Sequence, residues 1–296
     1  MILIDYSQVA ISNIMSFKQD LIQAQMTGDT KGSEDIIRHC ILSSLKMYKK
    51  RFGKDYGDVV VCCDSYNYWR KDYHPFYKSK RAGSREEDDM PWDVLFTIMS
   101  KVRDEIAEHS PYKVMRIERC EADDVIGVLC EHTNEFGNHE PVMIVSSDKD
   151  FKQLQKFDNV KQFSPIQKKL VTDDNPRAYL WNHIMRGDSG DGIPNVLSAD
   201  DTFISEKSQT PLRQTKIDMW IENADNLREV MDEETYRNYQ RNKKLIDLND
   251  IPEEIQSPII NTFIEQPLAM RMKVLNYLIK KRCNRLIEVV EEFYNG

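Results

Sequence analysis

Nine carboxylates stand in five short clusters of this 296-residue chain, and their types could support metal-dependent chemistry. They are Asp5, Asp64, Glu121, Asp123, Asp124, Asp148, Asp150, Asp188 and Asp191. Any one cluster is more simply explained as a helix cap or a turn. Gathered in one crevice, however, like charges ~4 Å apart would repel by ~4 kcal/mol per pair at an effective dielectric of ~20. Bound cations would neutralise that repulsion.

Oxygen ligands without His or Cys in the clusters favour Mg²⁺ or Mn²⁺ over Zn²⁺. Nine acids exceed what one octahedral ion needs, which predicts two ions roughly 3.5–4 Å apart. Such a pair suits in-line displacement at phosphorus, because one ion lowers the pKa of the attacking water and the other stabilises the leaving oxygen. Phosphatases acting on small molecules could use the same arrangement.

A basic and aromatic segment directly after Asp64 favours a nucleic-acid substrate over a small one. Between residues 70 and 85 six basic residues accompany one acid, and aromatic residues are interleaved with them. The basic residues are Arg70, Lys71, Lys78, Lys80, Arg81 and Arg85, and the aromatic ones are Tyr66, Tyr68, Trp69, Tyr73, Phe76 and Tyr77. This composition is typical of single-strand binding surfaces. An exposed loop whose aromatics pack on the core is the alternative.

The net charge of −8 does not exclude a polyanionic partner. Of the 49 acidic residues, 40 remain once the nine proposed ligands are set aside, against 41 basic residues. The rest of the chain is therefore near neutral, with its cations concentrated where a polyanion would enter.

Hydrophobic periodicity predicts the elements that position these residues. Apolar runs at residues 1–5, 59–64, 113–118 and 142–148 read as strands, with a further run at 160–163, and residues 35–52 and 92–108 read as amphipathic helices. This alternation predicts an α/β fold with a mostly parallel central sheet and helices on both faces. Three of the runs end on Asp5, Asp64 and Asp148, and parallel sheets bind ligands at the carboxyl ends of their strands.

The second half of the chain reads as helix only. Residues 177–186, 212–223, 233–246 and 268–293 carry helical patterns, and Pro194, Pro211, Pro252, Pro258 and Pro267 punctuate them. We predict an α/β domain over residues 1–175 and a smaller all-helical domain over residues 176–296. The charged segment 78–89 lacks apolar periodicity and predicts a mobile arch, within about residues 66–92, or a solvated linker.

Cysteine usage and the chain start indicate the compartment. The six cysteines lack paired spacing, and Cys62, Cys63 and Cys130 lie in apolar runs typical of core thiols. The amino terminus reads as a strand and not as a signal peptide, and no stretch approaches the ~18 apolar residues of a membrane span. We expect a cytoplasmic protein with no membrane partner.

Taken in order, the motifs resemble those of the 5′-nuclease family, which includes flap endonucleases, the 5′-nuclease domains of bacterial polymerases and phage enzymes with ribonuclease H activity. The matching features are LIDYSQ at the start, YWRKD, Tyr77-Lys78-x-x-Arg81, EADD, VSSDKDF and MRGDSGDGIPNV. Each piece alone is weak, but the ordered set is specific, and it is sharpest over residues 1–196.

The resemblance implies roles for individual residues. The nine acids match those that hold two Mg²⁺, with Mn²⁺ as a substitute, and Asp64, Asp123 and Asp148 are expected to be essential for catalysis. Lys78 and Arg81 match arch residues that grip the scissile phosphate, while Tyr77, Arg70, Lys71 and Lys80 are expected to contact nucleic acid. Residues 187–196, with Gly190 and Gly192, resemble the start of a helix–hairpin–helix element that holds duplex phosphates. K⁺ at that element is left open.

The implied fold is the PIN-like 5′-nuclease fold, and the implied activity is that of a Mg²⁺-dependent 5′-3′ exonuclease and flap endonuclease with RNase H activity. Such an enzyme removes RNA primers and adjacent DNA during replication. Its partners would be DNA and RNA–DNA duplexes with 5′ ends, flaps or forks, and by resemblance a single-strand-binding protein; we expect a monomer.

Two departures from the family pattern weaken parts of this expectation. LSADDTF follows the GDGIPNV motif where many members have a second glycine-rich turn, which leaves the strength and K⁺ dependence of the duplex grip open. The chain also begins almost at its first strand, which argues against sliding-clamp contact through an amino-terminal extension.

Other functions fit less well. A structure-specific nucleic-acid-binding protein without catalysis is the main alternative, although every family acid is present. A PIN-type RNase would lack GDSGDGIPN. An aspartyl-phosphate phosphotransferase would need an aspartate where Ser7 stands, and a dinucleotide-binding enzyme would need a GxGxxG turn that the sequence lacks.

Overall fold

A single twisted sheet forms the centre of the protein, here described from a computed structural model that covers residues 1–86, 88–135, 137–205, 207–267 and 271–295. In these residues six strands pair in the order β3-β2-β1-β4-β5-β6. They are β1 (Ile2–Asp5), β2 (Val59–Cys63), β3 (Lys113–Arg116), β4 (Val142–Val145), β5 (Val160–Ser164) and β6 (Lys169–Val171). The first five are parallel, as predicted, and β6 is an antiparallel edge strand that its short, exposed sequence did not reveal.

The register aligns the carboxyl ends of the central strands. Asp5 pairs with Cys62 on one side, and its neighbour Ile4 pairs with Val145 on the other. The strand order reverses between β1 and β4, since β2 and β3 follow on one side of β1 while β4 and β5 lie on the other. Parallel sheets bind their ligands at such a switch point.

Alternating side chains of the strands fill two cores, one on each face of the sheet. Ile2 and Ile4 pack into the first core, whereas Leu3 between them packs into the second. Helices that carry residues of the first core are α1 (Tyr6–Ile14), α2 (Lys18–Thr27), α3 (Lys31–Tyr56) and α6 (Trp92–His109), with η1 (Met15–Phe17) joining the first two. The second core is covered by α7 (Ala122–Glu135), η2 (Lys149–Lys156) and α12 (Glu253–Glu265). Helices on both faces confirm the predicted fold class.

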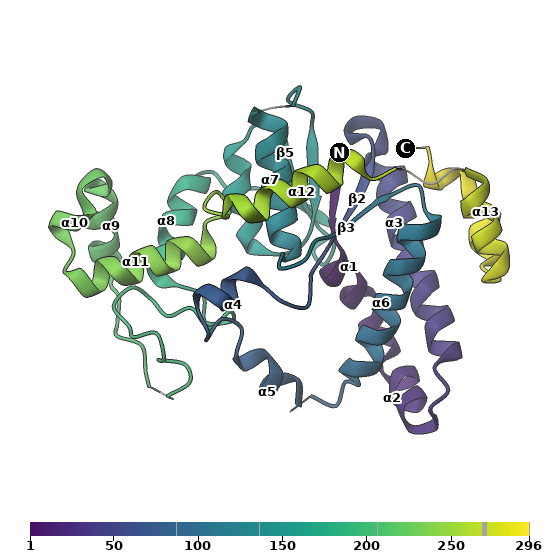
Figure 1. Ribbon diagram of the computed structural model, residues 1–296, viewed down its shortest axis with the longest axis horizontal. Helices are drawn as coiled ribbons and strands as arrows, with labels where there is room; N and C mark the ends of the chain where they lie inside the picture. The colour runs from purple at the N-terminus through teal and green to yellow at the C-terminus, as the bar shows by residue number, and fades with distance from the viewer. Residues whose placement is uncertain (87, 136, 206, 268–270, 296) are drawn as a thin grey trace.

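The segment expected to form an arch contains two short helices, α4 (Trp69–Tyr73) and α5 (Lys80–Glu86). No helix was predicted within this arch, because the lack of an apolar stripe hid α5, which good helix-forming residues such as Lys80 and Arg81 favour. The mobility of the arch stays a prediction. Figure 1 shows α5 crossing from the side of α4 to that of α6. Residue 87 lies outside the described part of the segment. Trp69 and Tyr77 are buried and fix its amino-terminal half.

Beyond β6 the helices form a third core before returning to the sheet. The third core is built by α8 (Pro176–Arg186), α9 (Gln214–Glu222), α10 (Leu227–Val230) and α11 (Glu233–Ile246), with η3 (Ala224–Asn226) between α9 and α10. Tyr77 of the arch also packs into it. Next along the chain, α12 packs on α7. Pro258 lies inside α12 and does not end it, because in the second turn it removes only one backbone hydrogen bond.

The last helices pack against the first core. They are α13 (Arg271–Lys280), α14 (Asn284–Ile287) and η4 (Val290–Phe293), and the expected helix over residues 268–293 lies partly outside the described residues. Glu105 of α6 accepts hydrogen bonds from Arg38 Nε at 2.7 Å and from Tyr277 Oη of α13 at 2.8 Å. Burial opposes ionisation, but these bonds and one from Lys281 lower the pKa of Glu105 to about 2.

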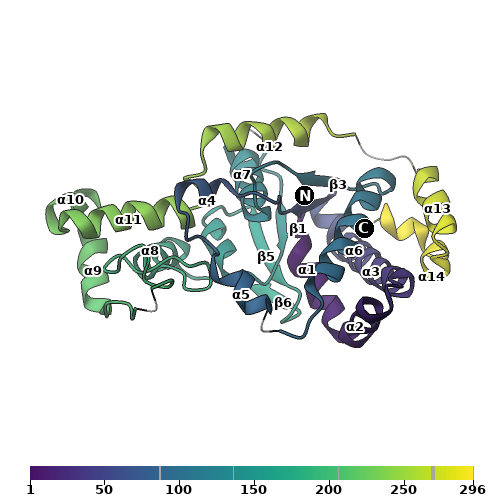
Figure 2. The same cartoon turned by 60° about the horizontal axis from the view of Figure 1, so that its bottom comes forward.

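The helices after residue 176 therefore do not pack as one body. Figure 2 shows α8–α11 at one end of the molecule, α13 and α14 at the other, and α12 running between them across the α/β core. A domain boundary at residue 175 stays a prediction. In the part of the chain that the structure describes, none of the helices combines the length and apolar character that a membrane crossing needs.

A turn after α8 docks on the base of the arch. Gly192 has φ +74°, and a Cβ there would lie 2.7 Å from the carbonyl oxygen of Phe76. The adjacent Asp191 carbonyl accepts a hydrogen bond from Lys78 N at 2.8 Å. Only glycine fits both the backbone conformation and the close approach.

We predict that Gly192→Ala destabilises the protein by about 2 kcal/mol, because alanine disfavours this φ and meets Phe76. The melting temperature should fall by about 4–8 °C, measured by circular dichroism. Gly32→Ala is the control: it lies in α3 with open space around it and should leave the melting temperature unchanged or slightly higher. Equal melting temperatures for Gly192→Ala and the wild type would contradict the docking.

Candidate functional site

Acids from three strands meet at the carboxyl edge of the sheet. Asp5 ends β1, and its Oδ2 accepts a hydrogen bond from Ser146 Oγ, just beyond β4, at 3.0 Å. Asp64, just beyond β2, accepts hydrogen bonds from Ser7 Oγ at 2.9 Å and from Ala122 N at 3.0 Å. These bonds place the ends of β1, β2 and β4 and the start of α7 around one site, as the strand-end argument predicted.

The acids raise one another's pKa values. Burial, and after it the charge of Asp64, raises the pKa of Asp5 to about 7. Burial and the charge of Asp148 raise the pKa of Asp123 well above its ordinary range. Asp148 itself caps η2 by accepting a hydrogen bond from Asp150 N at 2.9 Å. This edge of the sheet is therefore short of positive charge.

A buried arginine lies beneath two further acids. Arg70 of α4, with 2% of its side chain exposed, lies 2.9 Å from Glu121 Oε2 and 2.7 Å from Asp124 Oδ1. Its Nε donates to the carbonyl of Leu245 at 2.9 Å, and Trp69 Nε1 donates to Asp124 at 3.2 Å. The expectation that Arg70 contacts nucleic acid is therefore wrong in this structure, because two buried carboxylates turn its guanidinium inward.

Two arch residues expected to grip a phosphate reach the acids from the other side. The Lys78 ammonium contacts Glu121 and lies 3.6 Å from Asp191 Oδ2, and Lys78 has φ 55°. Burial alone would lower the pKa of Lys78, but Tyr77, Glu121 and Asp191 raise it well above its usual value. Arg81, about half exposed, pairs with Asp191 Oδ1 at 2.5 Å.

The other arch residues divide between the interior and the surface. Tyr77 is buried, and its hydroxyl lies within hydrogen-bond distance of Glu121, at 3.0 Å, and Asp191, at 3.2 Å. Lys71 and Lys80 are exposed. The Nζ atom of Lys71 lies 5.1 Å from the ring centroid of Tyr68, and that of Lys80 lies 5.0 Å from the ring centroid of Phe203. These two lysines remain free to meet a phosphate backbone, whereas Tyr77 can act only by supporting the acids.

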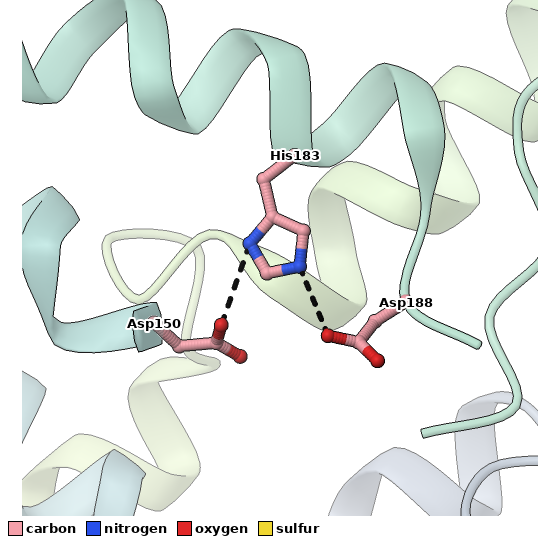
Figure 3. Close-up of side chains that lie close together, drawn as sticks. All are labelled: Asp150, His183 and Asp188. Carbon is pink, nitrogen blue, oxygen red and sulfur yellow. Dashed lines mark hydrogen bonds and ion pairs between the residues drawn. The ribbon is translucent and has the colours of Figure 1, made fainter. Parts of the chain in front are cut away.

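A second group of ligand atoms includes a histidine that the sequence argument missed. One atom each of Asp150, His183 and Asp188 lie within 4.8 Å of one another (Figure 3). Asp188 Oδ2 also lies 2.8 Å from Lys149 Nζ, and its Oδ1 accepts from Gly190 N at 2.8 Å. His183 lies on α8, five residues before Asp188. That spacing was the available signal, but only carboxylates were considered.

A cavity of about 320 Å³ opens beside Asp64. Cationic and aromatic side chains line it, with polar groups of α1 between them, and the lining includes Tyr66, Tyr68, Arg81, Arg85, Phe96 and Arg103. Arg85 lies over the ring of Phe96 at 4.8 Å. Such a lining can take a phosphate and an unstacked base.

The expected helix–hairpin–helix element is incomplete. Its first helix, α8, is followed by a turn closed by a bridge between Asp188 and Ile193. No second helix follows directly in the described residues, since α9 begins only at Gln214. Gly190 is exposed in the turn, whereas Gly192 is buried against the arch and cannot contact a duplex as expected.

The sequence matches two family descriptions that together span most of it. Residues 1–179 match the "5′-3′ exonuclease, N-terminal resolvase-like domain", and residues 175–293 match "T4 RNase H, C terminal". The chain is 34% identical to the ribonuclease H of Enterobacteria phage T4 over 98% of this chain and 95% of that protein. It is 27% identical to an exonuclease of Escherichia phage T7 over 60% of this chain and 59% of that protein.

Solved structures share the fold. A flap endonuclease of bacteriophage T5, in a pseudo-enzyme-product complex with DNA and metal ions, has a TM-score of 0.61 at 16% identity, covering 89% of this chain and 97% of that one. The T5 5′-exonuclease with bound zinc has a TM-score of 0.58 at 16% identity, covering 90% and 98%. The sequence matches go further than the fold: the chain belongs to the 5′-3′ exonuclease family, whose members are metal-dependent phosphodiesterases.

Proposed function

We propose that this nuclease is a Mg²⁺-dependent 5′-3′ exonuclease and flap endonuclease with RNase H activity, which removes RNA primers and adjacent DNA during replication. The observation that carries the proposal is the meeting of acids from β1, β2, β4, α7 and the turn after α8 beside the cations of the arch. The phage ribonuclease H and the phage exonuclease to which the chain is similar also support hydrolysis of nucleic acid.

The residues at the carboxyl edge fit two divalent cations. In the described part of the chain, Asp150 Oδ1 and His183 Nδ1 are buried without a hydrogen-bond partner. Unpaired buried polar atoms are costly, and a bound cation removes that cost. One cation would be held by the acids at the strand ends and on α7, which are Asp5, Asp64, Glu121, Asp123, Asp124 and Asp148. The other would be held by Asp150, Asp188 and Asp191.

Magnesium bound there supplies the charge that lowers the pKa of an attacking water and stabilises the leaving oxygen. The residues of the chain provide the positioning. Lys78 and Arg81 now pair with Glu121 and Asp191. Once cations neutralise those acids, both side chains can turn their charge to the phosphoryl oxygens. The cavity beside Asp64 accommodates the single-stranded 5′ segment, and no side chain is needed as a nucleophile.

The substrates would be DNA and RNA–DNA duplexes with 5′ ends, flaps or forks. The T5 flap endonuclease complex with DNA supports this class of substrate. Lys71 and Lys80 would meet the phosphate backbone, and the exposed backbone of Gly190 would face the duplex. We further propose a monomer that acts in the host-cell cytoplasm, with a single-strand-binding protein as a partner.

We predict that Asp148→Asn, or Asp123→Asn, lowers Mg²⁺-dependent cleavage by more than about 100-fold, because a cation ligand is lost. The assay uses 3′-labelled duplexes with a 5′ RNA segment or a 5′ DNA flap, with Mg²⁺ or with chelator. Asp158→Asn is the control, since 88% of that side chain is exposed and its ion-pair partner among the described residues is His139. Duplex binding without cleavage by the wild type would favour the non-catalytic alternative.

A second prediction concerns pH and metal together. The pKa values of Asp5 and Asp150 are raised to about 7 by burial, from an ordinary value of 3.8. Stability from a raised carboxyl pKa is fully present below 3.8 and is lost as pH rises through about 7. The metal-free protein should therefore melt at a lower temperature at pH 8 than at pH 6.

Magnesium should raise the melting temperature more at pH 8 than at pH 6, because at pH 6 it must displace protons. At 100 times Kd the gain is about 2.7 kcal/mol. That corresponds to roughly 5–10 °C, measured by differential scanning calorimetry. A melting temperature at pH 8 that does not respond to Mg²⁺ would contradict cation binding by these acids.

A third prediction separates two neighbouring exposed cations of α5, Lys80 and Arg81. Arg81→Ala should lower kcat about 10–100-fold, because Arg81 lies against the acids where charge develops on the phosphate. Lys80→Ala should mainly raise KM, since Lys80 lies over Phe203 and away from the acids. Steady-state cleavage kinetics measure both. An unchanged kcat with a raised KM in Arg81→Ala would show that Arg81 acts only in binding.

A further inference from the structure

His183 occupies an unusual position between two carboxylates. It projects from α8 and is 7% exposed. Its Nε2 lies 3.2 Å from Asp188 Oδ2, and its Nδ1 lies 3.5 Å from Asp150 Oδ1, as Figure 3 shows. The imidazole therefore bridges the start of η2 and the turn that follows α8.

The two contacts are chemically different. The Nε2–Asp188 contact is a hydrogen bond, whereas Nδ1 and Asp150 Oδ1 are both buried without a hydrogen-bond partner in the described residues. Two lone-pair atoms thus face each other at a separation too long for a hydrogen bond. Ligands on bonds of ~2.1 Å lie ~3.4 Å apart around a tetrahedral ion and ~3.0 Å apart around an octahedral one. The observed separation of 3.5 Å is close to the tetrahedral value.

The hydrogen bond to Asp188 also sets the tautomer. With its proton on Nε2, the ring presents a lone pair at Nδ1, which is the form that binds metals. A carboxylate that accepts the other ring N–H is the usual support of a histidine ligand. Asp188 is itself held by Lys149 at 2.8 Å and by Gly190 N, so this support is fixed.

A protonated His183 acting only as a counter-ion is the competing explanation. It would need an Nδ1–H bond to Asp150, which the geometry does not provide. Asp188 also already has a cation in Lys149. The two explanations predict opposite effects of replacing the ring by another positive charge.

We propose that His183 is a nitrogen ligand of the cation held by Asp150, with Asp188 as the carboxylate that supports the ring, so that this site binds Mn²⁺ and Co²⁺ more strongly, relative to Mg²⁺, than carboxylates alone would. Imidazole suits transition metals, whereas Mg²⁺ prefers oxygen. The inference rests on the proposed cation-dependent function, but it concerns binding and is tested without cleavage.

The test measures nitrogen coordination directly in the full chain. Metal-free protein is loaded with Mn²⁺ and examined by electron spin-echo envelope modulation, which detects ¹⁴N bound to the metal. Two variants are compared: His183→Gln, which removes the ring, and His183→Lys, which keeps a positive charge but offers no imidazole. His39→Gln on α3 is the control, and circular dichroism checks that each variant folds.

Support would be a ¹⁴N coupling in the wild type and in His39→Gln that is lost in both His183 variants. Mn²⁺ affinity at this site should then fall at least about 10-fold. Mg²⁺ affinity, from competition with Mn²⁺, should change less. Absence of the coupling in the wild type, its survival in His183→Lys, or wild-type Mn²⁺ affinity in His183→Lys would each overturn the proposal. If the coupling is present while Mg²⁺ supports no cleavage, the proposed function fails and the histidine ligand stands.

Discussion

Repulsion among the carboxylates at one edge of the sheet is the constraint that the surrounding residues must offset. A parallel sheet delivers the ends of β1, β2 and β4 to the same edge, and the side chains there cannot separate without breaking the register. Arg70, in the protein interior, neutralises Glu121 and Asp124, and Lys149, at the surface, neutralises Asp188. Removing one partner of such a buried pair typically costs 3–5 kcal/mol. The pKa values of Asp5, Asp123 and Asp150 stay raised, and a bound ion has most to gain at these positions.

The same electrostatics ties the arch to the acids. Lys78 and Arg81 serve as counter-ions of Glu121 and Asp191 in the metal-free protein. Cations bound at the proposed site would compete for these acids, so that occupancy of the site and release of the arch side chains would be linked equilibria. The arch is also held mechanically, since Tyr77 packs into the third core and Gly192 closes against Phe76. The positions of the arch side chains Lys78 and Arg81 thus depend on the helices that follow the sheet in the chain.

The sequence predicted the parts of the site that follow from strand geometry. An aspartate after a buried apolar run must lie at the carboxyl edge of a parallel sheet, so the convergence of Asp5, Asp64 and Asp148 needed no tertiary information. The inward turn of Arg70 could not be predicted, because periodicity shows which face of a helix is apolar but not which partner a polar side chain meets. His183 had a signal in its spacing from Asp188, but only carboxylates were considered as ligands. For the same reason the return of α12 and α13 to the sheet was missed, since an apolar stripe can pack on any core.

The departure from the family pattern after residue 196 has a structural counterpart on α11. Where a second helix would brace the turn, Asn242 donates hydrogen bonds to the carbonyls of Ile184 and Pro194, each at 2.8 Å. Asp200, in the divergent LSADDTF stretch, pairs with Arg237 at 3.1 Å and with Arg241. The turn is thus held by side chains from behind and not by a helix alongside it. A duplex bound as proposed would meet an isolated turn next to the arch, and its binding would then depend more on the arch lysines than in a chain with two hairpin helices.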